Sequence, residues 1–229
     1  MIAALARVPL ARLVRTRRMW MVLASWAIVA IIAAVFARTR GSTSGADHVM
    51  RGTFGRFVFP LLEYAIVGAA IGGVGMRRGI RGLVGLGSSP RQAALATSLV
   101  ASAACAVVGG ILAAIVCAVA HGPADPPLGA DLFASTWIGA LGGAAYGAYF
   151  AAGSAIGKGG TVRGIFLAAD FIIGSGAGMG AAFVPRGHVL ALLGGPLVAD
   201  IPQRGSSVML VVILAMWTTV AVLASRRPA

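Results

Sequence analysis

Residues 76–91 read MRRGIRGLVGLGSSPR and separate two long apolar runs of the chain. The stretch carries Arg77, Arg78, Arg81 and Arg91 and has no acidic residue. Four guanidinium groups cannot share the hydrocarbon of a bilayer, because each would cost about 2.5 kcal/mol or more there. The apolar residues between the arginines favour short helical turns over a slack linker. We therefore predict a compact cationic segment at a membrane surface, which is called the platform below.

Composition points to a membrane protein. The 229 residues are 59% hydrophobic and only 11% charged, with a mean hydropathy of +0.91. A soluble domain is about a quarter charged, whereas the apolar residues here fall into blocks of about 20, enough to cross roughly 30 Å of hydrocarbon. We predict an all-α polytopic membrane protein in which residues 1–229 form a single transmembrane domain. Its six spans are predicted at about 19–37, 57–76, 92–120, 132–156, 162–184 and 207–225.

Lysine and arginine decide the predicted orientation. The formal net charge is +13, but the cations gather at span ends, so they indicate topology and lipid headgroups and not nucleic acid. With the N-terminus inside, 13 of the 19 Lys and Arg residues fall on the cytoplasmic side. The outer connection His121–Asp131 has two acids and no cation, which agrees with this orientation, whereas four arginines in the first outer connection weaken it. We predict that both termini lie in the cytoplasm.

Two segments beside the spans have special patterns. Residues 1–18 carry five arginines and no acid, which predicts a helix in the membrane interface, interrupted at Pro9. A cleaved signal peptide is the less favoured alternative, because the apolar run that follows is long for one. Residues 183–205 are too apolar for a solvated loop and contain too many prolines for a span. A short helix in the outer interface or a re-entrant hairpin before the last span fits them.

Two acidic residues fall inside predicted spans. Glu63 lies in the second span and Asp170 in the fifth. A charge in hydrocarbon is costly, so each side chain is expected to face protein or water. For both residues, a role in ion coupling or substrate contact and a purely structural hydrogen bond are open. All three histidines lie in outer connections, which argues against a proton relay through the spans.

Glycines recur at helical spacing inside the spans. Small residues along one helix face let the backbones approach closely. We predict helix packing at these positions, and we favour packing within the subunit over a dimer interface. The positions are Gly139, Gly143 and Gly147 in the fourth span, and Gly174 and Gly178 in the fifth.

Motifs of soluble enzymes are missing from the sequence. Residues 152–159 resemble a phosphate-binding loop only superficially, because Ala152 replaces its first glycine and Gly159 replaces the Ser or Thr after its lysine. No Gly-x-Ser-x-Gly, His-Glu-x-x-His or paired-carboxylate motif occurs. Cys105 and Cys117 share one apolar run and lie too far apart along it for a disulfide. We expect no cofactor, no metal site and no enzymatic activity in this chain.

The platform resembles a short stretch of a known transporter family. The segments GLVGL at 82–86 and SSPR at 88–91, followed by a long apolar run, are similar to the inner connection after the second span of type-2 ABC exporter permeases. Six spans, a basic N-terminal helix, cytoplasmic termini and an apolar outer segment before the last span are also similar to that family. Arg77, Arg78 and Arg81 stand in the region where the family usually has a Glu.

The resemblance implies a permease subunit of an ATP-driven exporter in a bacterial-type plasma (inner) membrane, in contact with its lipids. Substrate would pass between two permease subunits, in a homodimer or a heterodimer, and separate ATPase subunits would supply the energy. Glu63 and Asp170 would lie near the pathway. The residues expected to couple to the ATPase are Arg77, Arg78, Arg81, Leu83, Pro90 and Arg91.

Two other functions fit the same sequence. A non-transport membrane scaffold, acting as an anchor or assembly subunit of a larger complex, also suits glycine-rich helices with few polar residues. A secondary transporter is less favoured, since the sequence shows neither an internal repeat nor a convincing ion site.

Overall fold

The computed structural model describes residues 2–41, 44–157 and 159–225, and every regular element within these ranges is helical. Four helical runs are long and apolar enough to cross a membrane, which indicates an integral membrane protein. They are α2 (Arg17–Thr39), the continuous run Gly45–Ile71, α7 (Pro90–Ala120) and α11 (Gln203–Ala224).

The run Gly45–Ile71 differs from the span predicted at 57–76. It begins as α3 (Gly45–Val49), continues as a π-helix, η1 (Met50–Val58), and ends as α4 (Phe59–Ile71). Gly72 then adopts a left-handed conformation, with φ +88°, which is a common way to stop a helix. The predicted end at residue 76 is therefore wrong, and much of the first outer connection is helical.

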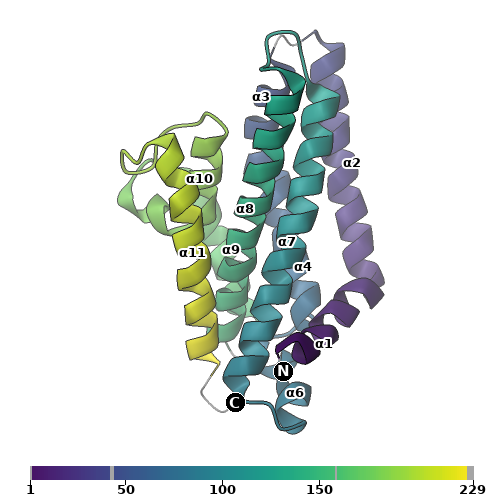
Figure 1. Ribbon diagram of the computed structural model, residues 1–229, viewed down its shortest axis with the longest axis vertical. Helices are drawn as coiled ribbons and strands as arrows, with labels where there is room; N and C mark the ends of the chain where they lie inside the picture. The colour runs from purple at the N-terminus through teal and green to yellow at the C-terminus, as the bar shows by residue number, and fades with distance from the viewer. Residues whose placement is uncertain (1, 42–43, 158, 226–229) are drawn as a thin grey trace.

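Helices α7 and α8 form the central hairpin of the bundle. Helix α8 (Leu128–Ile156) is as long as the spanning helices but is not one of these four runs. Nearly every residue from 138 to 155 is buried, and many of these positions are glycine or alanine. Figure 1 shows α8 between α7 and α11, with α2 on the far side of α7.

The fifth predicted span, 162–184, is not one helix. Helix α9 (Thr161–Ile173) has 13 residues, which at about 1.5 Å per residue give a length of roughly 20 Å. That is shorter than the hydrocarbon layer of about 30 Å. Three glycines within residues 174–178 disfavour further helix, and the chain continues as a short 3-10 helix, η2 (Met179–Phe183).

A short helix does lie within residues 183–205. Helix α10 (Pro185–Leu192) starts with a proline in its first turn, where the missing amide hydrogen removes no helical bond. Its His188 is fully buried, with Nδ1 3.3 Å from Ser206 Oγ and Nε2 3.2 Å from the Ala182 carbonyl oxygen.

The N-terminal helix α1 (Ile2–Arg15) runs through Pro9 without a break, so the expected interruption is wrong. A proline inside a helix removes one backbone hydrogen bond, and packing of α1 on α4 and α7, with Leu13 buried, offsets that loss. In Figure 1, α1 and α6 lie at the same end of the bundle as the C-terminal end of α11, and α3 lies at the opposite end.

Candidate functional site

The platform contains two short helices, α5 (Met76–Gly79) and α6 (Arg81–Gly85), between α4 and α7. Met76, Ile80 and Leu83 point into the bundle, with exposed fractions of 0%, 3% and 5%. Burying three large apolar side chains in so short a segment removes each of them from water and holds the platform in place. The platform is thus a packed element of the fold.

Arginine side chains tie the platform to the first and last helices. Arg12 Nη1 donates to the carbonyl oxygens of Ile71 (3.3 Å) and Gly79 (2.9 Å), at the ends of α4 and α5. The last carbonyls of a helix lack intrahelical donors and carry partial negative charge, so a guanidinium is favourable there. Arg77 Nη2 donates to the carbonyl oxygen of Ala224, the last residue of α11, at 3.1 Å.

The junction of the platform with α7 is also fixed by hydrogen bonds. Ser89 and Gln92 form a capping box, in which each side chain accepts a hydrogen bond from the backbone N–H of the other residue, at 3.3 and 3.4 Å. Ser88 Oγ donates to the Leu83 carbonyl oxygen at 2.5 Å. These bonds define the direction in which α7 leaves the platform.

The outer surface of the platform is basic and carries one large apolar side chain. Arg78, Arg81 and Arg91 are exposed, and Leu86 is 86% exposed. We call these four residues the docking face. The exposure of Leu86 has no signal in the sequence, because a leucine in an apolar, glycine-rich segment can point inward or outward.

Three of the six residues predicted to contact an ATPase are directed inward. Leu83 is buried, Arg77 is bonded to α11, and Pro90 is half-buried at the start of α7. Leu83 is inaccessible to a partner, so any coupling through it depends on its packing in the bundle and not on direct contact. These residues position the platform, whereas the four residues of the docking face are the exposed ones.

The connection between α8 and α9 packs against residues 74 and 75, which directly precede the platform. Gly160 has φ +81°, and a Cβ there would lie 3.2 Å from the carbonyl carbon of Val74 and 3.3 Å from the nitrogen of Gly75. Glycine is the residue that combines a left-handed backbone with such a close approach. Both connections at this end of the bundle therefore form one surface.

Glu63 is buried between α4 and α7. Its exposed fraction is 0%, and neither carboxylate oxygen has a hydrogen-bond partner among the described residues. A Cβ on Gly109 would lie 2.9 Å from Glu63 Oε1, so the carboxyl group occupies space that this glycine leaves. An unpartnered acidic group in an apolar core is costly, which makes Glu63 the strongest candidate for an intramembrane role.

Asp170, in contrast, is surrounded by partners. Its Oδ2 lies 3.2 Å from Arg186 Nε and accepts a hydrogen bond from the Tyr146 hydroxyl at 3.0 Å. Its Oδ1 accepts from the backbone N–H of Arg186 at 3.3 Å. The Arg186 guanidinium also donates to Ser175 Oγ at 3.2 Å and stacks on the Phe171 ring at 3.8 Å. This arrangement assigns Asp170 the structural role left open by the sequence.

The same guanidinium reaches the π-helical segment before α4. Arg186 Nη2 donates to the carbonyl oxygen of Arg56. Pro60 has no amide hydrogen for an α-helical bond to that carbonyl, so Arg186 supplies a donor where the helix lacks one. The Asp170–Arg186 pair therefore joins α8, α9, α10 and η1.

Two of the cations in the orientation count are buried. Arg163 is 8% exposed and its guanidinium lies 4.7 Å from the centre of the Tyr64 ring. Arg186 is 3% exposed. Both are held by the protein interior, so they are weaker indicators of topology than surface cations. Three other cations used for the orientation, Lys158, Arg226 and Arg227, lie outside the described residues.

The three glycines predicted in the fourth span face α7. A Cβ on Gly143 would lie 2.4 Å from the Cys105 carbonyl oxygen, and one on Gly147 would lie 2.5 Å from Ser102 Cα. Gly139 approaches the α7 backbone equally closely. Packing at these positions lies within the subunit.

Gly174 and Gly178 do not share a helical face, because α9 ends at Ile173. A Cβ on Gly174 would lie 2.8 Å from Arg186 Cβ, so its small size makes room for the buried arginine. A Cβ on Gly178 would meet nothing within 4 Å. The packing role predicted for Gly178 is therefore wrong.

No known protein family and no curated protein matches this sequence.

Proposed function

We propose that this chain is the permease subunit of an ABC-type exporter and that a separate ATPase subunit acts on its platform. The observation that carries the proposal is the platform itself. Its inner side is packed into the bundle, while Arg78, Arg81, Leu86 and Arg91 are presented outward. A packed element between two membrane helices transmits a displacement to both of them, whereas a slack loop would absorb it.

The hydrogen bonds of the platform support this role. A movement of α5 would be passed to α1 through Arg12 and to α11 through Arg77. It would also be passed to α4 and α7 directly along the chain. One docking event at the platform would therefore act on both sides of the bundle.

The order of the elements supports the same proposal. A basic N-terminal helix, a platform after the second membrane helix and a broken segment before the last one follow the order expected for type-2 ABC exporter permeases. In this proposal the platform and both termini are cytoplasmic, and α8 and α9 complete a six-helix domain. Helix α9 is too short to cross the membrane alone, so η2 and α10 occupy the outer part of the membrane next to it.

Glu63 is our candidate for a residue near the substrate pathway, because its carboxyl group has no charged partner among the described residues and only the Cys105 thiol beside it. Asp170 instead holds helices together. Helices α2 and α11 leave large apolar side chains uncovered, among them Ile28, Ile32 and Val208. These faces offer surface for lipid and for a second permease subunit.

Purification of the full chain from its own membranes tests the proposal. We expect the wild-type protein to be recovered with a separate ATPase. Leu86→Asp replaces the large apolar side chain of the docking face with a carboxylate and should reduce the recovered ATPase by roughly tenfold or more, as loss of an interface residue that carries much of the binding energy does. The matched control is Leu128→Asp, at a 44% exposed leucine on the opposite end of the bundle, which should leave the recovery unchanged.

Reproducible isolation of the wild-type chain without an ATPase would contradict the proposal and would favour the membrane scaffold. Equal recovery of the ATPase with wild type and Leu86→Asp would show that any ATPase docks away from the platform.

A further inference from the structure

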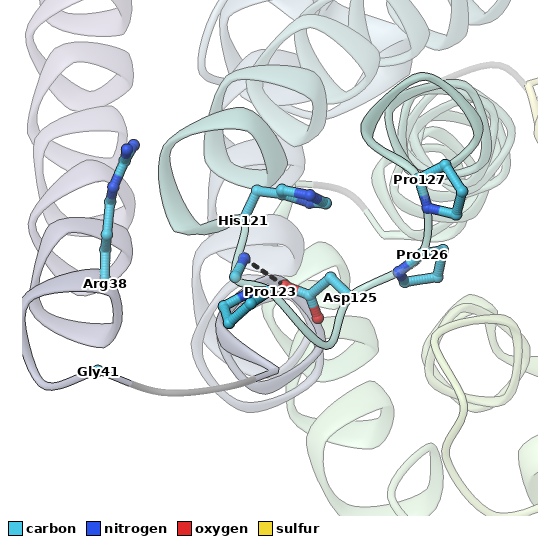
Figure 2. Close-up of a pocket in the computed structure, with 8 residues that line it drawn as sticks. Arg38, Gly41, His121, Pro123, Asp125, Pro126 and Pro127 are labelled. Atoms are coloured by element: carbon cyan, nitrogen blue, oxygen red, sulfur yellow. Dashed lines mark hydrogen bonds between the residues drawn. The ribbon is translucent and has the colours of Figure 1, made fainter.

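Three side chains with metal-binding atoms converge at the end of the bundle opposite the platform. His121 directly follows α7, Asp125 lies in the connection to α8, and Asp131 lies in the first turn of α8. One such atom from each residue lies within 4.8 Å of the other two. Figure 2 shows His121 and Asp125 at the wall of a cavity of about 700 Å³.

The atoms concerned are shielded from solvent and lack partners. His121 Nδ1, Asp125 Oδ1 and Asp131 Oδ2 are all buried, and none has a nitrogen or oxygen hydrogen-bond partner among the described residues, although the Cys117 thiol lies beside Asp131. The approach of His121 Nδ1 to Asp131 Oδ2, at 3.6 Å, is too long for a good hydrogen bond. Three buried polar atoms without partners in one place are unusual, because each costs free energy.

The remaining oxygen of Asp125 is held firmly. Its Oδ2 accepts hydrogen bonds from the backbone N–H groups of Gly122 (2.8 Å, dashed in Figure 2) and Ala46 (3.0 Å). Such bonds fix the orientation of a carboxylate, as the supporting bonds around metal ligands do. They leave Oδ1 free for a further partner and connect the cluster to α3.

A bound cation would balance the two carboxylates of the cluster. Across the described ranges, no Lys or Arg nitrogen lies within 4.0 Å of a carboxylate oxygen of Asp125 or Asp131. Arg38 lines the same cavity, but Figure 2 shows its side chain directed away from Asp125. Two adjacent carboxylates repel each other, and a protonated His121 would balance only one of them.

We propose that His121, Asp125 and Asp131 bind one divalent transition-metal ion of the zinc class. Imidazole nitrogen and carboxylate oxygen are both zinc ligands, and two ligands about 2.1 Å from a tetrahedral ion lie about 3.4 Å apart. The 3.6 Å between His121 Nδ1 and Asp131 Oδ2 is close to that value. Three protein ligands leave a fourth position for water. The ion joins the end of α7 to the start of α8 and, through Asp125, to α3.

Zinc binding to the metal-depleted full chain in detergent tests this proposal. We expect one saturable Zn²⁺ per chain, a higher thermal midpoint with the ion bound, and visible absorption bands of bound Co²⁺ that Zn²⁺ displaces. His121→Gln and Asp131→Asn should each weaken zinc binding by more than about tenfold. The matched controls are His48→Gln and Asp47→Asn, at exposed residues of α3, which should bind zinc as the wild type does.

Stability in chelator separates a metal site from a simple ion pair. If the cluster is a metal site, Asp131→Asn removes one of two carboxylates that repel each other. In chelator, this variant is then at least as stable as the wild type. With Zn²⁺ present, the variant is less stable than the wild type. With an ion pair, Asp131→Asn is less stable than the wild type under both conditions, which would overturn the proposal. Zinc binding that is lost in His48→Gln but kept in His121→Gln would overturn it as well.

Discussion

Arg186→Met is expected to lower the thermal midpoint of the detergent-solubilised protein by roughly 10 °C or more. Methionine keeps much of the apolar stem but leaves the Asp170 carboxylate buried without a cation and removes the donor to the Arg56 carbonyl. Removing one partner of a buried ion pair costs about 3–5 kcal/mol. In a chain of this length, 1 kcal/mol corresponds to about 2–4 °C in thermal midpoint.

Two further variants make the Arg186 result specific. Arg204→Met removes an exposed arginine at the start of α11 and should change stability by less than about 0.5 kcal/mol. The double variant Arg186→Met/Asp170→Asn leaves no unpaired charge, so it should recover part of the loss. If Arg186→Met is no more destabilising than Arg204→Met, the Asp170–Arg186 pair does not hold these helices together.

Gly143→Ala is expected to destabilise the α7–α8 hairpin by about 1–3 kcal/mol. The new Cβ would lie 2.4 Å from the backbone oxygen of Cys105, so the two helices must separate to admit it. Alanine is a better helix former than glycine by about 1 kcal/mol. A net loss of stability would therefore show that the clash with Cys105 outweighs this gain. The thermal midpoint in detergent measures it.

Gly129→Ala is the matched control, because Gly129 lies in the same helix and a Cβ there would meet nothing within 4 Å. This variant should be neutral or slightly more stable than the wild type. Equal losses in Gly129→Ala and Gly143→Ala would show that the close packing of α7 and α8 is not the cause.

The helical membrane character could be predicted from the sequence, because apolar blocks of span length and the missing acids of the platform are local properties. Some helix ends could be predicted too, since α7 ends at Ala120 and α8 ends at Ile156, as the predicted spans do. The end of α4 could not. Gly72 stops α4 with a left-handed backbone, although the apolar pattern continues beyond it. Glycine within an apolar run signals close packing or a helix end, and only the tertiary structure separates the two outcomes.

The buried ion pair shows the same limit. Asp170 was recognised as an intramembrane acid, and Arg186 was counted as a loop cation, because they lie in different predicted segments. Their contact depends on α9 ending at Ile173, after which the chain turns and places Arg186 against Asp170. The hydropathy of residues 162–184 does not indicate that turn.

The outer cluster was missed for a related reason. His121, Asp125 and Asp131 have no recognised spacing of metal ligands, and the two acids served only as a topology signal. They come together because the connection between α7 and α8 folds back and Asp125 is bonded to α3. The sequence motifs predict no metal site, and the proposed zinc site would overturn that prediction.

Photo-crosslinking from position 86 tests the central claim most directly. A photoreactive amino acid replaces Leu86 in the full chain, the native membranes are irradiated, and the crosslinked product is identified by mass spectrometry. The account predicts a light-dependent crosslink to a separate ATPase subunit from position 86 and none from position 128, at the opposite end of the bundle. An ATPase that copurifies with the chain but crosslinks equally from both positions, or from neither, would contradict docking at the platform.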